Sequence, residues 1–320
     1  MIIEGKKVVV TGAAGFIGSH LVDKLLEMKC EVVGIDNLSS GKEEFLRSAK
    51  RKKRFKFIKY DLLEDEGLEE YMDGASIVFH LAANPDVRIG ESNSSVHLEQ
   101  NVIATYVVLE AMRAMGVPTM VFTSTSTVYG EADKVPTPEN YGPLVPISLY
   151  GGSKLAAEAM ISSYAHTFDM RAVLYRFANV VGPRSTHGVI HDFVEKLKKN
   201  PDELEILGAE PGTRKSYVHI EDTIEGIIHG THVAQERVEI YNIGSEDLID
   251  VKTIADIVSE EMGLKPKYRW TGGVDGGRGW KGDVKLMHLD IQKLMSRGWK
   301  PKMRSADAVK ATVRSIIGKK

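Results

Sequence analysis

Residues 11–18 have the sequence TGAAGFIG and lie between two patterned segments. Before them, Lys7–Val10 is a short apolar run typical of a buried strand, and residues 16–29 show the apolar spacing of an amphipathic helix. The glycines stand three residues apart, which allows a tight turn, a close approach of the backbone to a pyrophosphate, and close packing of helix on sheet. The free amides and positive end of such a helix favour phosphate groups. The segment therefore predicts a dinucleotide-binding turn.

A carboxylate at the end of the next strand pattern supports this prediction. Residues 31–35 form the second strand-like run, and Asp36 and Asn37 follow it directly. Asp36 stands at the usual distance from the glycines to accept hydrogen bonds from both hydroxyls of a ribose. A carboxylate there repels a 2′-phosphate, so the sequence predicts NAD rather than NADP as the cofactor. The alternative is that Asp36 is a plain turn residue.

Two later segments lie where a bound dinucleotide would continue. Asp61 and Leu62 follow a strand pattern at residues 55–59 and are candidate adenine contacts, with a simple turn carboxylate as the alternative for Asp61. A fourth strand pattern, at residues 76–81, leads into small side chains that suit backbone packed against a dinucleotide. These residues are Leu81, Ala82 and Ala83.

The chain alternates strand and helix patterns as far as about Arg176. Strands that are apolar at nearly every position predict an α/β fold, with a doubly wound parallel sheet covered by helices on both faces. Beyond this point, loops rich in glycine, proline and charge separate shorter segments. We therefore expect a dinucleotide-binding Rossmann domain at residues 1–177, to which segments of about 216–245 return, and a smaller C-terminal α/β substrate domain mainly at 178–320.

The composition disfavours several classes of protein. Lys and Arg number 42 and Asp and Glu 44, a net charge of −2, which gives no argument for nucleic acid or a membrane as the main partner. We interpret the basic cluster at residues 50–54 as a solvated surface. Cys30 is the only cysteine and the histidines lack metal-like spacing, so no disulfide within the chain and no metal site is expected. Without a signal-peptide pattern or an apolar run long enough to span a bilayer, we expect a cytoplasmic protein.

Tyr150 and Lys154 are candidate catalytic residues. Their spacing puts the phenol and the ammonium on one face of a helix, so we expect Lys154 to lower the pKa of Tyr150 toward neutrality and make it a general base. Such pairs also occur by chance on helix surfaces. Residues 123–127, however, are five consecutive hydroxyl side chains at the edge of the sheet where such folds bind ligands. One of these hydroxyls can hydrogen-bond the reacting oxygen, while the others cap turns or bond to nearby backbone.

Together these segments resemble the extended short-chain dehydrogenase/reductases, most closely the nucleotide-sugar epimerases of the UDP-glucose 4-epimerase type. The resemblance covers almost the whole chain and rests on ordered motifs: TGAAGFIGSH at 11–20, DNLSSG at 36–41, HLAANPDVR at 80–88, NVIAT at 101–105, TSTSTVYG at 123–130, YGGSK at 150–154, RFANVVGPR at 176–184, YVHIED at 217–222 and RGWKGD at 278–283. It implies an isomerase that uses NAD to invert the sugar C4 hydroxyl through a transient 4-keto intermediate, as in galactose metabolism. It also implies a homodimer formed by two long helices, for which residues 96–115 and 147–168 are the candidates.

The resemblance assigns roles to individual residues. The catalytic residues would be Thr125, Tyr150 and Lys154. The cofactor would be bound by Gly12, Gly15, Phe16, Ile17, Gly18, Asp36, Asn37, Asp61, Leu62, Leu81, Ala82, Ala83, Asn101 and Phe177, with Tyr150 and Lys154. The UDP-sugar would be bound by Arg88 near the sugar, Thr125, Asn179 at the phosphates, Val189 and Leu207 at the nucleobase, and Arg214, Lys215 and Arg278. Because Arg278 stands farther than usual from Gly282 and Asp283, the pyrophosphate contact stays open between Arg278 and the pair Arg214 and Lys215.

Two neighbouring positions disfavour related reactions. Sugar dehydratases and decarboxylases of this kind carry acidic residues just after the catalytic threonine, whereas this chain has Ser126 and Thr127. The alternatives are an epimerase acting on UDP-glucuronate or a UDP-N-acetylhexosamine, a sugar reductase, and a non-catalytic NAD-binding protein. The last usually loses the tyrosine or the lysine, and both are present here.

Overall fold

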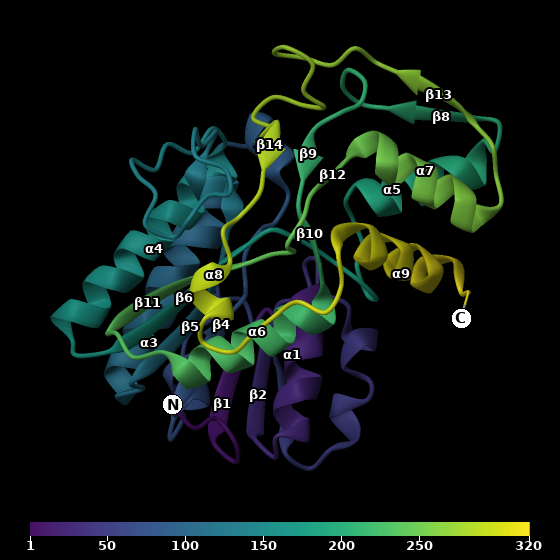
Figure 1. The fold of residues 1–320 in the computed structure, drawn as a ribbon. Coiled ribbons are helices and arrows are strands. Elements are labelled where there is room, and N and C mark those ends of the chain that lie inside the picture. Colours follow the sequence, from purple (N-terminus) through teal and green to yellow (C-terminus); the bar gives the residue numbers. More distant parts are fainter. Residues whose placement is uncertain (320) are drawn as a thin grey trace. The chain divides into compact units, whose positions relative to one another are not determined.

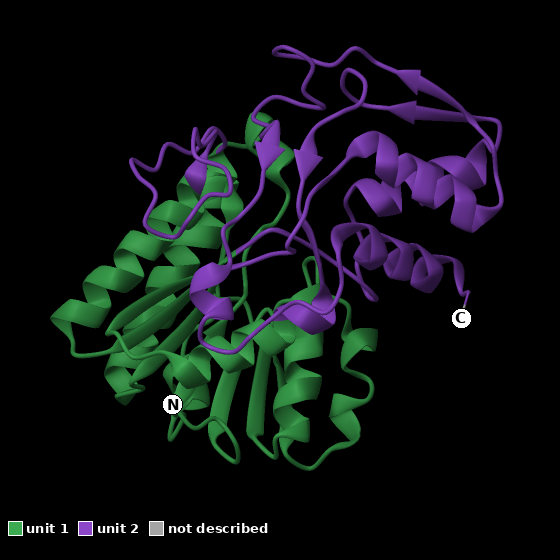
Figure 2. Ribbon diagram, in the orientation of Figure 1, with its two compact units in different colours: residues 1–128, 149–176, 224–241 green, residues 129–148, 177–223, 242–320 purple. Residues whose placement is uncertain are grey.

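The computed structural model describes residues 1–319, which divide into two compact units (Figure 2). Unit 1 contains residues 1–128, 149–176 and 224–241, and unit 2 contains residues 129–148, 177–223 and those from 242 onward. The expected first domain included residues 129–148, but these group with unit 2. The reason is long-range pairing, because Tyr129 donates to Asn242 at 2.8 Å and the Thr137 amide donates to the His288 carbonyl at 2.8 Å.

Unit 1 is organised around a seven-stranded sheet (Figure 1). Its strands are β1 (Lys7–Thr11), β2 (Glu31–Asp36), β3 (Phe55–Lys59), β4 (Ile77–His80), β5 (Thr119–Thr125), β6 (Arg171–Phe177) and β11 (Val238–Ile243). Their order is β11-β6-β5-β4-β1-β2-β3, and β1 pairs in parallel with both β2 and β4. The predicted doubly wound sheet is confirmed, and the strand order reverses between β1 and β4, where such sheets bind ligands.

The strands are buried as their sequences predict. Val8, Val9 and Val10 of β1 are fully buried, and every residue of β5 is buried. A strand buried on both faces needs apolar side chains without alternation, which explains the continuous apolar runs. The helices of unit 1 are α1 (Phe16–Glu27), α2 (Glu69–Met72), α3 (Ala104–Met115), α4 (Leu149–Thr167) and most of α6 (Ile220–Val233).

Helices cover both faces of this sheet (Figure 1). On the face of α3 and α4, strand residues such as Val78 and Phe122 pack with Leu109 and Ile161 in one apolar cluster. On the other face, Tyr175 of β6 donates to the α6 carbonyl of Ile227 at 2.8 Å. Short 3-10 turns connect other elements: η1 (Glu43–Leu46), η2 (Ala49–Arg51), η3 (Val87–Glu91) and η5 (Ser126–Tyr129).

The helix expected over residues 96–115 differs in its first part. Leu98–Ile103 forms a π-helical turn, η4, and α3 begins directly after it. Such turns add a residue to the helix and occur frequently at functional sites. The helix ends at Gly116, whose φ of 65° is the left-handed conformation that glycine adopts readily.

Unit 2 is a smaller α/β assembly, as expected. It has three small sheets, formed by β7 (Asn179–Val181) with β10 (Tyr217–His219), by β9 (Arg214–Lys215) with β12 (Ile249–Asp250) and β14 (Leu286–Met287), and by β8 (Glu203–Ile206) with β13 (Lys267–Trp270). Its helices are α5 (Val189–Lys199), α7 (Val251–Met262), α8 (Gln292–Met295) and α9 (Ser305–Ile317). An apolar cluster joins β8, α5, α7 and α9 through residues such as Ile206, Val194, Val258 and Val313.

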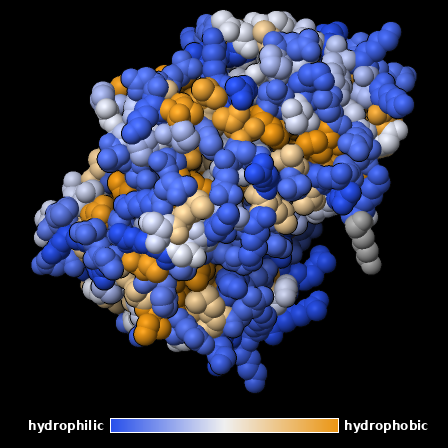
Figure 3. Space-filling model, in the orientation of Figure 1, coloured by the Kyte–Doolittle hydropathy of each residue, from blue (hydrophilic) through white to orange (hydrophobic). Residues whose placement is uncertain are grey.

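The face of the molecule drawn in Figure 3 is mostly hydrophilic. Hydrophobic residues lie in several small groups among the hydrophilic ones. Scattered exposed apolar residues are normal for a folded protein. Among residues 1–319, no helix combines the length and apolar character that crossing a bilayer requires.

Candidate active site

The glycine turn after β1 leaves no room for a side chain at Gly12 or Gly18. A Cβ on Gly12 would lie 2.7 Å from the Ala82 amide nitrogen, and a Cβ on Gly18 would lie 2.0 Å from the Gly12 carbonyl oxygen. The turn therefore lies directly against the chain that leaves β4. Helix α1 begins at Phe16 with no side-chain cap and no acidic residue in its first turn. Its positive end stays uncompensated, which fits a pyrophosphate at this turn.

Asp36 lies at the end of β2, within hydrogen-bonding distance of the same turn. Its two carboxylate oxygens accept from the Ala14 amide at 2.9 Å and the Leu38 amide at 2.8 Å. Burial raises the pKa of Asp36, and these two bonds oppose the rise. Each carboxylate oxygen has more than one lone pair, so ribose hydroxyls can still be accepted. The site thus fits the adenosine half of a dinucleotide.

The ends of β2 and β3 are tied together beside Asp36. Asn37 donates to the Asp61 carboxylate at 2.7 Å, and the Leu63 amide donates to its other oxygen at 2.9 Å. Leu62, in contrast, is buried in the apolar cluster beneath α3 and α4. Leu81, Ala82 and Ala83 are half-buried where the chain leaves β4.

Thr125 and Tyr150 are brought together by the end of β5 and the start of α4. The Thr125 hydroxyl hydrogen-bonds the Tyr150 phenol. Burial nevertheless raises the pKa of Tyr150 to about 12, and the bond to Thr125 only partly offsets this. The prediction that Lys154 brings the pKa of Tyr150 toward neutrality is therefore wrong for the chain alone. Desolvation of the phenolate outweighs any attraction from Lys154.

Lys154 is itself desolvated. It is 2% exposed, and its Nζ lies 4.1 Å from the centroid of the Phe122 ring. Burial lowers the pKa of Lys154 to about 7, while the Glu158 carboxylate acts in the opposite direction. A lysine with a pKa near neutrality is partly neutral at physiological pH and can accept a proton, whereas an exposed lysine stays protonated.

A buried ion pair beneath Lys154 was not predicted from the sequence. Arg176 of β6 donates to both oxygens of Glu158, from Nη2 at 2.7 Å and from Nε at 3.0 Å, and the Ser124 hydroxyl also hydrogen-bonds Glu158. These contacts satisfy two charges that would be costly to bury alone. The available signal was the position of Glu158, one helical turn after Lys154.

The π-helical turn η4 is tied to α4 by Asn101. The Asn101 side chain accepts from the Asn84 amide at 2.7 Å and donates to the Ser153 hydroxyl at 2.9 Å, and it is 1% exposed. His97, also in this region, places its ring against Tyr150 with the ring centroids 5.7 Å apart. The sequence did not single out His97. Asn101 thus links the chain after β4 to the helix that carries Tyr150 and Lys154, and a direct cofactor contact by Asn101 stays a prediction.

Unit 2 gathers several of the residues expected to bind substrate. Asn179 starts β7, and its Nδ2 is buried with no hydrogen-bond partner among residues 1–319. Lys215 is ion-paired with the buried Asp283, and its Nζ lies 5.3 Å from the centroid of the Trp280 ring. The Trp280 Nε1 is likewise buried without a partner in the described chain. A buried donor without a partner is costly, so these two N–H groups fit a site where they donate hydrogen bonds to a ligand.

The other predicted residues differ in their exposure. Phe177 is buried at the end of β6, and Val189 is half-buried at the start of α5. Leu207 and Arg214 are exposed, and Arg88 on η3 forms only a long ion pair with Asp86, at 3.7 Å. Lys215 and Arg278, in contrast, have their charges engaged by carboxylates.

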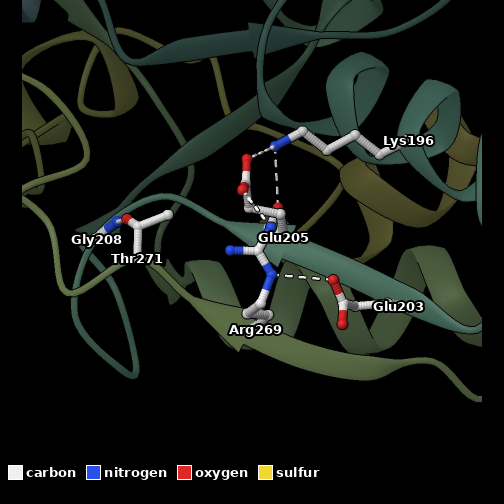
Figure 4. Close-up of polar contacts among 6 residues, drawn as sticks. All are labelled: Lys196, Glu203, Glu205, Gly208, Arg269 and Thr271. Carbon is white, nitrogen blue, oxygen red and sulfur yellow. Dashed lines mark hydrogen bonds and ion pairs between the residues drawn. The ribbon is translucent and has the colours of Figure 1, made fainter.

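Charged contacts fix the strand pair that flanks Leu207 (Figure 4). Arg269 of β13 donates to Glu203 at 2.9 Å and to Glu205 at 2.5 Å, both on β8. Just beyond these strands, the Gly208 amide donates to the Thr271 hydroxyl at 3.1 Å. The loop from Thr271 that carries Arg278 therefore starts from a fixed position next to Leu207.

Comparison with known proteins points to one family. The model of the NAD dependent epimerase/dehydratase family matches residues 8–244. A putative UDP-glucose 4-epimerase of Methanocaldococcus jannaschii is 33% identical over 313 residues, which is 96% of this chain and 97% of that protein. The crystal structure of a UDP-galactose 4-epimerase is similar with 44% identity and a TM-score of 0.85, over 98% of this chain and 99% of that one. UDP-glucuronic acid 4-epimerase from Bacillus cereus, in complex with UDP-glucuronic acid and NAD, is 28% identical with a TM-score of 0.88 and the same coverage.

Proposed function

The chain belongs to the NAD dependent epimerase/dehydratase family, and from that premise we propose that it interconverts UDP-glucose and UDP-galactose by inverting the sugar C4 hydroxyl. The observation that carries the proposal is the hydrogen bond between Thr125 and Tyr150 beside the buried Lys154. A hydroxyl, a phenol and an amine of this kind suit removal and return of a proton at one oxygen. Neither Ser126 nor Thr127 can act as the acid that dehydration requires.

The cofactor is NAD, and the glycine turn and Asp36 of unit 1 fit it. The adenosine ribose would be held by Asp36, and the pyrophosphate by the turn at Gly12, Gly15, Phe16, Ile17 and Gly18. Asn37, Asp61, Leu62, Leu81, Ala82, Ala83, Asn101 and Phe177 are proposed as further contacts along it. When bound, NAD accepts and returns the hydride, and its cationic ring favours a neighbouring phenolate.

Tyr150, Lys154 and Thr125 would transfer the proton of the C4 hydroxyl. Because the pKa of Tyr150 is raised to about 12, its phenol starts protonated and must lose that proton before it can act as a base. Lys154, whose pKa of about 7 leaves it partly neutral at neutral pH, would take up that proton. Tyr150 Oη would then take the proton of the C4 hydroxyl, with the Thr125 hydroxyl bonded to the same oxygen. After the 4-keto sugar has rotated in the site, Tyr150 would return the proton to the C4 oxygen.

The residues of unit 2 would hold the nucleotide part. The buried Nδ2 of Asn179 suits a phosphate oxygen, and Arg278 with Lys215 or Arg214 supplies positive charge for the diphosphate. Val189 and Leu207 are proposed at the nucleobase, and Arg88 near the sugar. A firm hold on the nucleotide leaves the sugar free to rotate, which inversion at C4 requires.

A second substrate class is favoured by one comparison. The Bacillus cereus structure holds UDP-glucuronic acid and NAD and is similar over 98% of this chain. The alternatives are therefore 4-epimerisation of UDP-glucuronate or of a UDP-N-acetylhexosamine. A sugar reductase would instead release NADH or NAD in proportion to product, and a non-catalytic protein would not need both Tyr150 and Lys154.

We also propose that two copies of the chain associate. Helix α3, with η4, and helix α4 carry exposed apolar residues, including Ile103, Tyr106, Leu149 and Phe168 at 43%, 44%, 49% and 44% exposed. Two such helices from each copy would form a four-helix bundle and bury these side chains.

The test of the proposal is conversion of UDP-galactose, followed by NMR, with the wild type and two variants. Tyr150→Phe should lose nearly all activity while keeping its NAD, because only the proton-transferring hydroxyl is removed. Tyr164→Phe is the matched control on the same helix, where the phenol donates to Glu110 at 2.7 Å, and it should stay active. An active Tyr150→Phe enzyme would contradict the role of Tyr150 as the base. Turnover of UDP-glucuronate alone would show that UDP-glucuronate, and not UDP-glucose, is the substrate.

A further inference from the structure

Arg278 is held by a carboxylate that neither the sequence nor the comparisons single out. Its Nη1 donates to Glu131 Oε1 at 2.6 Å, and its Nη2 donates to Glu131 Oε2 at 2.7 Å. Nη1 also donates to the Asp283 carbonyl at 2.5 Å. The pair is bidentate, which is the strongest and most directional form of an arginine–carboxylate contact. All three residues belong to unit 2.

Both partners come from anchored backbone. Gly130 directly precedes Glu131 with a φ of 62°, and a Cβ there would lie 1.9 Å from the Val145 carbonyl oxygen, so only glycine fits this turn. On the other side, Val274 and Arg278 exchange two backbone hydrogen bonds, at 2.8 and 3.0 Å. The Ala209 amide fixes the same loop by donating to the Gly277 carbonyl at 3.0 Å. Together with the Gly208–Thr271 contact in Figure 4, these bonds fix the backbone of the loop that carries Arg278.

The contacts leave one edge of the guanidinium available. Arginine has five N–H donors in a fixed plane. Glu131 and Asp283 take both donors of Nη1 and one of Nη2. Within residues 1–319 the remaining donors, on Nε and Nη2, have no protein acceptor. These two lie on the same edge and form a fork that matches two oxygens of a phosphate. The side chain of Arg278 is 14% exposed, so it is held in place without being sealed off.

Lys215 and Arg214, the other two candidate cations for the diphosphate, lack such a bidentate contact within the described residues. The ammonium of Lys215 is ion-paired with the Asp283 carboxylate, which is 2% exposed, and it faces the Trp280 ring. An ammonium is a point charge without a fork, so it cannot present two fixed donors. Arg214 is exposed. Of the three cations, Arg278 alone is oriented by two separate acceptors.

We propose that Glu131 is a positioning residue for the nucleotide sugar: it holds the Nη1–Nη2 end of Arg278 so that the Nε–Nη2 edge binds the diphosphate. This rests on the proposed function, in which a UDP-sugar binds to unit 2. Simple electrostatics predicts the reverse effect for Glu131, because a carboxylate near a diphosphate repels it. The sign of the effect of removing Glu131 therefore decides between orientation and repulsion.

The experiment measures the dissociation constant of UDP by calorimetry, and KM and kcat for UDP-galactose, on the NAD-loaded protein. Glu131→Ala should raise the UDP dissociation constant and KM at least about tenfold, the scale of one charge-assisted hydrogen bond, with kcat nearly unchanged. Glu131→Gln, which keeps one acceptor, should lose less. Asp169→Asn removes a different carboxylate that pairs with an arginine, Arg237, within unit 1, and it should leave UDP binding unchanged.

A double-variant cycle tests whether Glu131 acts through Arg278. In an Arg278→Ala background, Glu131→Ala should have no further effect on UDP binding. Unchanged or tighter UDP binding by Glu131→Ala alone would overturn the positioning role while leaving the proposed function intact. A wild-type protein that binds neither UDP nor UDP-galactose would instead overturn the proposed function, and the positioning role with it.

Discussion

At the scale of single residues, burial decides the chemistry of the titratable groups of unit 1. It raises the pKa of Tyr150 to about 12 and lowers that of Lys154 to about 7. His80 shows the same effect at the end of β4. Its ring lies between the hydroxyls of Thr11 and Thr105, at 2.7 and 3.0 Å, and burial together with nearby Lys154 lowers the pKa of His80 to about 3. The imidazole is therefore neutral in the folded protein at neutral pH.

The low pKa of His80 predicts a pH-dependent stability. Between about pH 6.5 and pH 3, the unfolded chain binds a proton at His80 that the folded chain does not, so the free energy of unfolding falls as the pH falls. Relative to His80→Gln, which cannot titrate, the wild type should lose about 2 kcal/mol between pH 7 and pH 5. Urea unfolding at both pH values measures this. Equal losses in the two proteins would show that His80 is not buried as a neutral group.

The sequence named candidate members of the site but did not reveal their environment. Thr125 and Tyr150 are hydrogen-bonded in the structure, and their catalytic roles stay predictions. The predicted direction of the pKa shift of Tyr150 was wrong because desolvation depends on packing, which spacing along a helix does not reveal. Arg176 and Glu131 were missed for a related reason. Glu131 pairs with Arg278, 147 residues along the chain, where no local pattern marks the partner. Glu158 stands one turn after Lys154, but this spacing does not reveal that Arg176 reaches it from β6.

At the scale of elements, the turn into α1 is the most constrained part of unit 1. A Cβ at Gly18 would lie 2.0 Å from a backbone oxygen, which cannot move as a flexible side chain can. Helix α4, in contrast, contains a glycine with room for a side chain. Gly152 lies inside it, and a Cβ there would meet nothing within 4 Å.

These two glycines give a matched prediction. Gly18→Ala should lower the free energy of unfolding by about 1–3 kcal/mol, because the methyl group overpacks the turn, and it should weaken NAD binding. Gly152→Ala should leave stability unchanged or raise it by about 0.5–1 kcal/mol, because alanine loses less entropy in a helix. Urea unfolding of the three proteins measures both effects. A Gly18→Ala protein as stable as the wild type would contradict the close packing of this turn.

The fold was predictable where elements have their own pattern. The strands β1 to β4 and the helix α1 match the expected segments to within about two residues. The spacing of α5 was also present, since Ile190, Phe193, Val194 and Leu197 are its buried residues, although no helix was expected there. Five short strands of unit 2 were not predictable, namely β7, β9, β10, β12 and β14. They have two or three residues and exist through distant pairing, such as Tyr217 with Asn179.

At the scale of the whole molecule, the proposed homodimer makes a prediction about association. Ile103 is exposed on η4, directly before α3, and should be buried in a four-helix bundle between two copies. Ile103→Glu should therefore give a monomer in size-exclusion chromatography with light scattering. Ile2→Glu is the control, because Ile2 is 66% exposed outside these helices, and it should stay dimeric. A monomeric wild type, or a dimeric Ile103→Glu protein, would contradict this interface.

The central claim is that hydride leaves and returns to the same sugar carbon. The most direct test supplies UDP-galactose labelled with deuterium at C4, in ordinary water, and follows the products by NMR and mass spectrometry. The account predicts UDP-glucose that retains deuterium at C4, with no accumulation of NADH. Loss of the label to water, NADH formed in proportion to product, or no UDP-glucose at all would contradict it.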